Sequence, residues 1–478
     1  MRKGPPMTAT TSRAPLADVD AIKAAIAGSI GVSGNTVDII DADRVRGSVI
    51  DSLVFTAVFG DEQPRDLSRW LIRAIAPQLG AFPASINDLY FAAGRGEYEH
   101  ATAPAINVRG MTFDKAQAVF RAARANDNKI VLFEIARSEM AYTWQRPAEY
   151  ASSVLAAAIK ANWQGPVFIQ GDHFQALRTA YGNDPEKEIG TVRALTQEGI
   201  EAGFYNIDVD ASTLVDINEE DLIVQQEKNY RHTAELTAFI RSIEPAGITV
   251  SVGGEIGEVG KHNSTVADLD AFMAGYLPAM ERESEVAGRS LTGISKISVQ
   301  TGTSHGGIVL PDGTIKDVAV DFDTLAALSR AGREKYGIGG AVQHGASTLP
   351  ESAFGKFAEA NAIEVHLATA FQSILLDSEH FPQDLRERMN AWLVENRASE
   401  RKDGETDLQF LAKTRKRVFG PFKRDLWDLP EETRAALTAE LEATYGNIMQ
   451  RLGVGGSAAL VDRIIQPVEV ELPAAPGL

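Results

Sequence analysis

Four of the eight histidines lie within or directly after short apolar segments, close to acidic residues. They are His173, which follows Asp172, and then His305, His344 and His366. The chain has no cysteine, so a bound metal ion would need histidine, aspartate or glutamate ligands. One such histidine alone is more often a core or loop residue, but several at the ends of successive segments favour a catalytic metal centre, which has three protein ligands and an open position.

The segments that carry these histidines belong to a series of short apolar runs that alternate with helical stretches. The eight runs span residues 104–108, 130–136, 166–170, 204–210, 248–254, 294–300, 339–345 and 362–368. Their near-continuous apolar character is typical of parallel strands covered on both faces. Eight strands alternating with helices predict a (β/α)8 TIM barrel, and this count favours the barrel over the competing doubly wound open sheet.

The length of 478 residues exceeds the roughly 250 residues that such a barrel needs. Helical periodicity before residue 95 and again after residue 380 predicts extensions at both ends. We therefore expect a mainly helical N-terminal extension (1–95), a barrel catalytic domain (96–380) and a helical C-terminal extension with a flexible tail (381–478).

Composition and charge exclude several function classes. The 47 Lys and Arg against 65 Asp and Glu give a formal charge of −18, which argues against nucleic acid as a partner. Local Arg or Lys residues can still bind a small anionic molecule. There is no apolar stretch of about 18 residues and no apolar segment typical of a secretory signal. We expect no membrane partner and a cytoplasmic location.

In a barrel, the chemistry belongs at the carboxyl ends of the strands. Acidic residues follow several of the predicted strands: Asp210 ends the fourth, Glu255 follows the fifth, and Glu364 lies in the eighth beside His366. Three of the other histidines, His100, His232 and His380, are expected to be solvated.

At these strand ends the sequence resembles the class II (metal-dependent) fructose-bisphosphate and ketose-bisphosphate aldolases over roughly residues 100–375. The motifs occur in the family's order along the chain: PAINVRG (104–110), Arg137-Ser138, Gln170-Gly171-Asp172-His173, Asp210-Ala211-Ser212, Gly254-Glu255-Ile256-Gly257, His305-Gly306 and His344-Gly345-Ala346-Ser347. Two departures stand out. Gln170 replaces the first histidine of the strand-three motif, and Glu364-Val365-His366-Leu367-Ala368 replaces Asn-x-Asp-Thr-Asp.

The resemblance implies a role for each matching residue. The metal ligands would be His173, His305 and His344, with Asp210 and Glu255 at a second or mobile metal position. Asp172 would be the acid/base at the substrate C4 hydroxyl, and Glu258 or His262 on a mobile loop would be the second acid/base. The implied substrate contacts are Arg137, Ser138, Ser212, Gly306, Gly345, Ser347, Glu364 and His366.

The implied activity is reversible retro-aldol cleavage of a ketose, phosphorylated and similar to fructose bisphosphate, through a metal-stabilised enediolate. Zn²⁺ is the first candidate for the metal, and Co²⁺, Mn²⁺ or Fe²⁺ also suit these ligands. Family members imply a homodimer or homotetramer. Two alternatives stay open: a metal-dependent sugar epimerase or isomerase, and a non-catalytic accessory subunit of a tagatose-bisphosphate-type aldolase.

Overall fold

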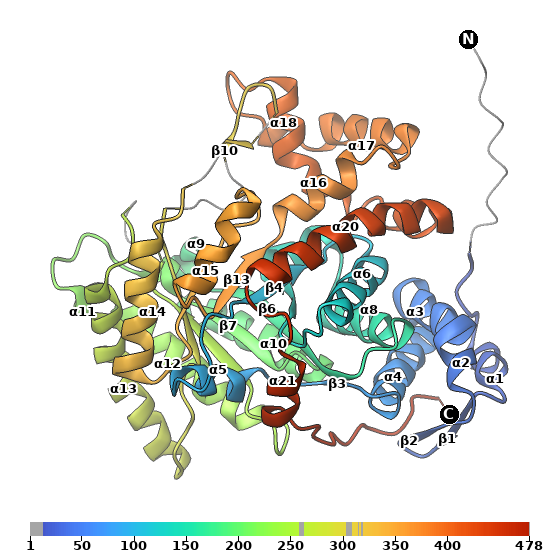
Figure 1. The fold of residues 1–478 in the computed structure, drawn as a ribbon, viewed down its shortest axis with the longest axis horizontal. Coiled ribbons are helices and arrows are strands. Elements are labelled where there is room, and N and C mark those ends of the chain that lie inside the picture. The colour runs from blue at the N-terminus through green and yellow to red at the C-terminus, as the bar shows by residue number, and fades with distance from the viewer. Residues whose placement is uncertain (1–12, 258–261, 303–307, 314, 317–318, 478) are drawn as a thin grey trace.

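Eight parallel strands close into a barrel surrounded by helices in the computed structural model (Figure 1). The structure describes all residues except 1–12, 258–261, 303–307, 314, 317–318 and 478. The barrel strands are β4 (Ala103–Asn107), β5 (Leu132–Ala136), β6 (Gly165–Gln175), β7 (Asn206–Asp210), β8 (Ser251–Glu255), β9 (Lys296–Val299), β12 (Ala341–Gln343) and β13 (Glu364–Leu367). Each overlaps one of the eight predicted runs, so the predicted (β/α)8 barrel is confirmed. The circle closes where β13 pairs with β4, with Glu364 beside Ala103.

Helices follow the barrel strands and surround the barrel. They are α6 (Thr112–Ala125), α7 (Arg137–Thr143), α8 (Pro147–Lys160), α9 (Arg178–Asn183), α10 (Pro185–Ala202), α11 (Leu222–Gln225), α12 (Glu227–Ile243), α13 (Val266–Ala287), α14 (Phe322–Tyr336), α15 (Phe354–Glu359) and α16 (Thr369–Asp377). A short antiparallel hairpin, β10 (Ile308–Val309) with β11 (Ile315–Lys316), lies between β9 and α14. Helix ends follow local chemistry: Asp184 caps α10 before Pro185, and Gly203 ends it in the left-handed conformation.

The N-terminal part adds helices and a ninth strand to the sheet. Its elements are α1 (Val19–Ile26), β1 (Ile30–Ser33), β2 (Thr36–Ile39), α2 (Ala42–Arg44), a π-helical turn (Val45–Val49), α3 (Ile50–Phe59), α4 (Glu62–Gln78), β3 (Ala81–Pro83) and α5 (Asn87–Gly94). Strand β3 pairs in parallel with the start of β6. The side chain of Asn206, the first residue of β7, accepts a hydrogen bond from Ile86 N at 2.8 Å. Helix α5 therefore lies at the amino end of the barrel strands, opposite the expected active site.

The C-terminal part is helical, packs against the barrel helix α6, and ends beside the N-terminal part. It contains α17 (Gln383–Asn396), α18 (Asp407–Thr414), a 3₁₀ turn (Arg415–Val418), α19 (Lys423–Trp427), α20 (Glu431–Arg451) and α21 (Ala458–Ile464), and α20 packs along α6. The last residues were predicted to be a loose tail. The structure places them beside the N-terminal hairpin, where Trp70 Nε1 donates to Pro473 O at 2.8 Å (Figure 1).

Among the described residues, no helix is both long enough and apolar enough to cross a membrane.

Candidate metal and active site

A bulge in β6 presents Asp172 and His173 to the barrel mouth. Two residues of β6, Asp172 and His173, stand against one of β7, Asp208, because Gly171 pairs with Ile207 and Phe174 with Val209. His173 has φ 43°, an unusual conformation for a residue with a side chain. Consecutive strand residues normally point to opposite faces, and a bulge re-aims a side chain. Asp172 and His173 can therefore both reach the same site.

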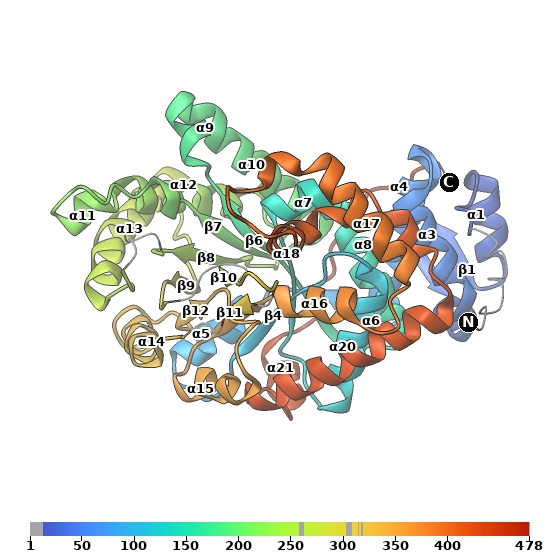
Figure 2. The ribbon, with the colours of Figure 1, turned by 90° about the horizontal axis from the view of Figure 1, so that it is seen from above.

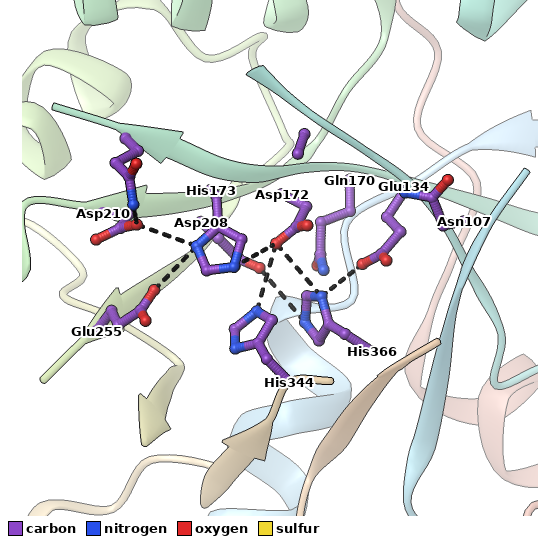
Figure 3. Close-up of polar contacts among 12 residues, drawn as sticks. Asn107, Glu134, Gln170, Asp172, His173, Asp208, Asp210, Glu255, His344 and His366 are labelled. Atoms are coloured by element: carbon purple, nitrogen blue, oxygen red, sulfur yellow. Dashed lines mark hydrogen bonds and ion pairs between the residues drawn. The ribbon is translucent and has the colours of Figure 1, made fainter. Parts of the chain in front are cut away.

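The two predicted ligands His173 and His344 meet directly in the structure (Figure 3). Their rings are stacked with centroids 4.3 Å apart, although they come from β6 and from the residue after β12. Asp172 Oδ1 lies 3.4 Å from His344 Nε2 and 3.8 Å from His173 Nε2. One carboxylate and two imidazoles thus converge, with their ligand atoms all within 4.8 Å of one another.

The other nitrogen of His173 faces two carboxylates. His173 Nδ1 lies 3.0 Å from Asp210 Oδ2 and 3.1 Å from Glu255 Oε2. Asp210 is held in turn by Gln175 Nε2 at 2.5 Å and by the hydroxyl of Ser212 at 2.7 Å. A carboxylate on the far nitrogen of a histidine fixes the ring orientation and tautomer, as is usual for metal-bound histidines.

The shifted pKa values around this cluster indicate a surplus of negative charge. Burial alone would lower the pKa of His173, but Asp172 and Glu255 outweigh it and raise that pKa well above its ordinary value. Burial and the neighbouring Asp210 raise the pKa of Glu255 to about 7. Burial and the histidines His366 and His173 lower the pKa of His344 well below its ordinary value, so this ring is neutral. A site with excess carboxylate and a neutral imidazole suits a cation.

His366, predicted to contact the substrate, lies between two glutamates. His366 Nδ1 is 2.5 Å from Glu134 Oε2, and its Nε2 is 2.6 Å from Glu364 Oε1. Its ring also packs on His344, with centroids 4.0 Å apart, and Nδ1 lies 3.4 Å from Asp172 Oδ1 (Figure 3). Burial alone would lower the pKa of His366, but Glu134 and Asp172 raise it well above its ordinary value. His366 is therefore an imidazolium beside the proposed acid/base.

A buried lysine lies under these groups, inside the barrel. Lys296, the first residue of β9, places its Nζ 2.7 Å from Glu364 Oε1, 2.9 Å from Asp208 Oδ1 and 2.8 Å from Gln170 Oε1. Tyr90 from α5 donates a hydrogen bond to the other oxygen of Glu364. Glu364 was predicted to contact the substrate, yet it is fully buried and pairs with Lys296. Its charge is thus compensated within the barrel.

A cavity of about 670 Å³ opens above the cluster. Its wall contains eight residues that the sequence placed in the site: Arg137, Ser138, Asp172, His173, His344, Gly345, Ser347 and His366. Arg137 is paired with Glu188 at 2.6 Å. Residues from the C-terminal helices complete the wall, and Figure 2 shows α18 and the β10–β11 hairpin in front of the barrel strands.

Other predicted site residues lie away from the cavity or outside the described chain. Ser212 is buried and bonded to Asp210, so it supports a carboxylate instead of lining the cavity. His262 is exposed and does not line the cavity. Glu258, His305 and Gly306 lie outside the described residues, and their predicted roles stay predictions. His232 was expected to be solvated but is buried, with its ring nitrogens 2.9 Å from Tyr181 OH and 3.0 Å from Glu235 Oε2.

Sequence reasoning missed Glu134, Lys296 and Tyr90. Glu134 and Lys296 are single charged residues inside otherwise apolar strand segments, IVLFEIA and ISKISVQ. A charge within a strand covered on both faces must point into the barrel and find a partner there, because an unpaired buried charge is strongly unfavourable. That signal was available. No sequence signal pointed to Tyr90, because its helix, α5, precedes the first barrel strand.

The donor set fits a divalent cation. Four groups of three possible ligands occur among the described residues, and two of them, Asp172–His173–His344 and His173–Asp210–Glu255, share His173. Imidazole with carboxylate suits Zn²⁺, Co²⁺, Mn²⁺ and Fe²⁺. His305, the third predicted histidine ligand, lies outside the described residues.

Comparisons with known proteins give a family match and distant structural similarity. The model of class-II fructose-bisphosphate aldolases matches residues 87–420. No curated protein matches the chain significantly. Similar solved structures include the YdjI aldolase of Escherichia coli K12, with 14% identity, 78% of this chain and 99% of that chain covered, and a TM-score of 0.44. They also include the fructose-bisphosphate aldolase of Campylobacter jejuni, which is 15% identical. The match covers 79% of this chain and 96% of that chain, with a TM-score of 0.44. The fructuronate-tagaturonate epimerase UxaE of Cohnella laeviribosi is 13% identical. The match covers 82% of this chain and 86% of that chain, and its TM-score of 0.53 supports the barrel fold.

Proposed function

Because this chain belongs to the class II fructose-bisphosphate aldolase family, we propose that it is a metal-dependent aldolase that cleaves a ketose reversibly between C3 and C4. The observation that supports this most is the convergence of His173, His344 and Asp172 at the carboxyl ends of two barrel strands, β6 and β12. All three line one cavity large enough for a sugar. The proposed partner is a small sugar or sugar phosphate.

The proton chemistry of the proposed reaction falls to Asp172. Its carboxylate lines the cavity, and burial would raise its pKa, but His173 and His366 lower that pKa well below its ordinary value. Asp172 is therefore ionised and can accept the C4 hydroxyl proton during cleavage, then return it during condensation. His366, fixed by Glu134 and Glu364, orients this carboxylate from below.

His173 and His344 would hold the divalent cation, and Asp210 and Glu255 would orient His173 or offer the cation a second position. When bound, the cation supplies Lewis-acid stabilisation of the negative charge that cleavage leaves on the substrate oxygens. Because the ring of His344 is neutral, it keeps a nitrogen lone pair that can bind the cation.

The proposal is tested by metal analysis together with retro-aldol assays. The purified protein is analysed for Zn, Co, Mn and Fe, and then assayed on phosphorylated and free ketoses with and without chelator, with released aldehyde as the readout. We expect about one or two metal ions per chain and aldehyde release that the chelator abolishes. A metal-free protein that stays silent on every ketose after Zn²⁺, Co²⁺ or Mn²⁺ is added would instead favour an accessory subunit.

A sugar epimerase is the second candidate. The observation that favours it is the proton-carrying pair Glu134–His366, 3.4 Å from Asp172 Oδ1 on the same cavity wall. Such a cluster could deliver a proton to a substrate centre without product release. A coupled aldehyde assay separates the two functions, because an epimerase changes the sugar composition without accumulating aldehyde.

The variant His344→Gln is expected to lose most of the bound metal and, with it, aldehyde release. The ring of His344 is neutral and stacked on His173, so its removal deletes a ligand without uncovering a buried charge. Metal content is measured by elemental analysis, and folding by circular dichroism. The control is His100→Gln, whose side chain is exposed and remote from the cluster; it should keep metal and activity. Unchanged metal content in His344→Gln would remove this residue from the ligand set.

A further inference from the structure

Helix α5 of the N-terminal part places a polar side chain inside the barrel. Its Tyr90 is 0% exposed, and the hydroxyl donates a hydrogen bond to Glu364 Oε2. The helix is tied to the amino end of the barrel, because Ile86, directly before it, donates its N–H to the side chain of Asn206 at 2.8 Å. Tyr90 therefore reaches the polar groups of the barrel from the end opposite the cavity.

The position of Tyr90 is fixed by close backbone packing. A Cβ on Gly339, in the loop between α14 and β12, would lie 3.0 Å from both the Cβ and the carbonyl oxygen of Tyr90. The missing side chain of glycine permits this close approach. Gly339 N in turn donates to Ser295 O at 2.7 Å, directly before β9. Tyr90 thus cannot shift without moving the backbone beside two barrel strands.

The two oxygens of Glu364 are held from different directions. Oε1 lies 2.7 Å from Lys296 Nζ, 2.7 Å from Gln170 Nε2 and 2.6 Å from His366 Nε2. Among the residues that the structure describes, the Tyr90 hydroxyl is the one hydrogen-bond donor to Oε2. The last torsion of a glutamate side chain has only a broad preference of its own. Contacts to Oε1 alone would let the carboxylate turn about the Cγ–Cδ bond, and the Tyr90 hydroxyl prevents this rotation.

His366 connects Glu364 to the proposed acid/base. It is 4% exposed, and its ring lies between Glu364 and Glu134, with Nδ1 2.5 Å from Glu134 Oε2. The same Nδ1 lies 3.4 Å from Asp172 Oδ1, and Figure 3 shows the two side chains facing each other. Buried polar groups that contact one another in this way are coupled more strongly than the same groups in water. Three successive contacts therefore lead from Tyr90 to Asp172.

We propose that Tyr90 is a positioning residue of the candidate active site: it fixes the carboxylate of Glu364, which fixes the ring of His366, which orients Asp172. Helix α5, which precedes the barrel, then sets the geometry of the acid/base from the amino end. The effect on turnover rests on the proposed aldolase function, whereas the effect on the His366 ring does not.

The effect on turnover is measured with Tyr90→Phe, which keeps the ring and removes only the hydroxyl. The variant should lower kcat roughly ten- to a hundredfold, the usual range for the loss of a supporting contact or a small misplacement of a catalytic group. Tyr90 does not line the cavity, so KM and metal content should stay within about twofold of the unmodified protein. Circular dichroism checks that the variant is folded.

The effect on the His366 ring is measured by NMR on Zn²⁺-loaded protein with ¹⁵N-labelled imidazoles. The chain has eight histidines, so the spectrum contains few signals, and the His366 signals are identified by their absence in His366→Gln. In Tyr90→Phe they should shift, because the carboxylate beside the ring loses its fixed orientation. The signals of the exposed His100 should stay in place.

The matched control is Tyr276→Phe, which removes a hydroxyl that is equally buried. Tyr276 is 1% exposed, its hydroxyl accepts a hydrogen bond from Ile294 N at 3.0 Å, and it does not line the cavity. This variant should keep both kcat and the His366 signals, which separates positioning from a general loss of a buried hydrogen bond.

Unchanged His366 signals in Tyr90→Phe would overturn the proposal. Shifted signals together with an undiminished kcat would also overturn it, because Tyr90 would then support the barrel without orienting the acid/base. If the unmodified protein releases no aldehyde from any ketose, the aldolase function fails, and the NMR comparison still decides whether Tyr90 positions His366.

Discussion

Replacing Asp172 with asparagine is expected to leave the metal bound and to reduce turnover by about two to four orders of magnitude, the usual contribution of a general acid/base. Asparagine keeps the size of the side chain and an oxygen that can face His344 and His366, but it cannot accept the substrate proton. The two imidazoles that would ligate the metal stay stacked on each other. Elemental analysis and the rate of aldehyde release measure the two effects separately.

The matched control for this variant is Asp210→Asn. Asp210 contacts the other nitrogen of His173 at 3.0 Å and does not line the cavity. Loss of such an orienting carboxylate typically weakens metal binding by about 10–100-fold. The Asp210 variant should therefore lose metal at low supply and regain activity when metal is added, whereas the Asp172 variant should not respond to metal. An Asp172→Asn protein that cleaves at nearly the original rate would show that another group moves the proton.

The sequence was sufficient to predict the barrel and part of the site. Each apolar run is short, rich in β-branched residues and flanked by helical periodicity, so its conformation is decided locally. Polar residues directly after such runs must gather at one end of a barrel whatever its detailed packing. Asp172, His173 and His344 could be brought together on that argument, although 172 positions separate Asp172 from His344 along the chain.

The rest of the site depends on pairings that no local pattern records. The bulge that turns both Asp172 and His173 toward the mouth arises from the register of β6 against β7. The resemblance implied that Glu364 meets the substrate, and nothing nearby in sequence indicates that Lys296 and Tyr90 bind it inside the barrel. The turn Arg415–Val418 contributes Arg415 and Lys416 to the cavity wall, and Phe419 directly after it packs on Gly110, more than 300 positions earlier in the chain.

Lys296→Met is expected to lower the free energy of unfolding by about 3–5 kcal/mol, the usual effect of removing one partner from a buried ion pair. Burial alone would lower the pKa of Lys296, but Asp208 and Glu364 outweigh it and raise that pKa, so the lysine is charged in the folded protein. Methionine fills a similar volume without charge. It would leave two buried carboxylates, Glu364 (0% exposed) and Asp208, with the single charge of His366 to balance them. Urea unfolding followed by fluorescence measures the change.

Two further variants separate this explanation from a general sensitivity to losing a lysine. Lys335→Met breaks an ion pair of the same length, 2.7 Å to Asp270, but both side chains are nearly half exposed, so the expected change is below about 1 kcal/mol. The double variant Lys296→Met/Glu364→Gln should regain part of the stability lost in Lys296→Met, because glutamine removes the carboxylate charge that Lys296 balanced and can still accept the Tyr90 hydroxyl. If the double variant were instead less stable than Lys296→Met by the full effect of Glu364→Gln alone, the two side chains would be energetically independent. The buried charge pair would then not be what holds Glu364 inside the barrel.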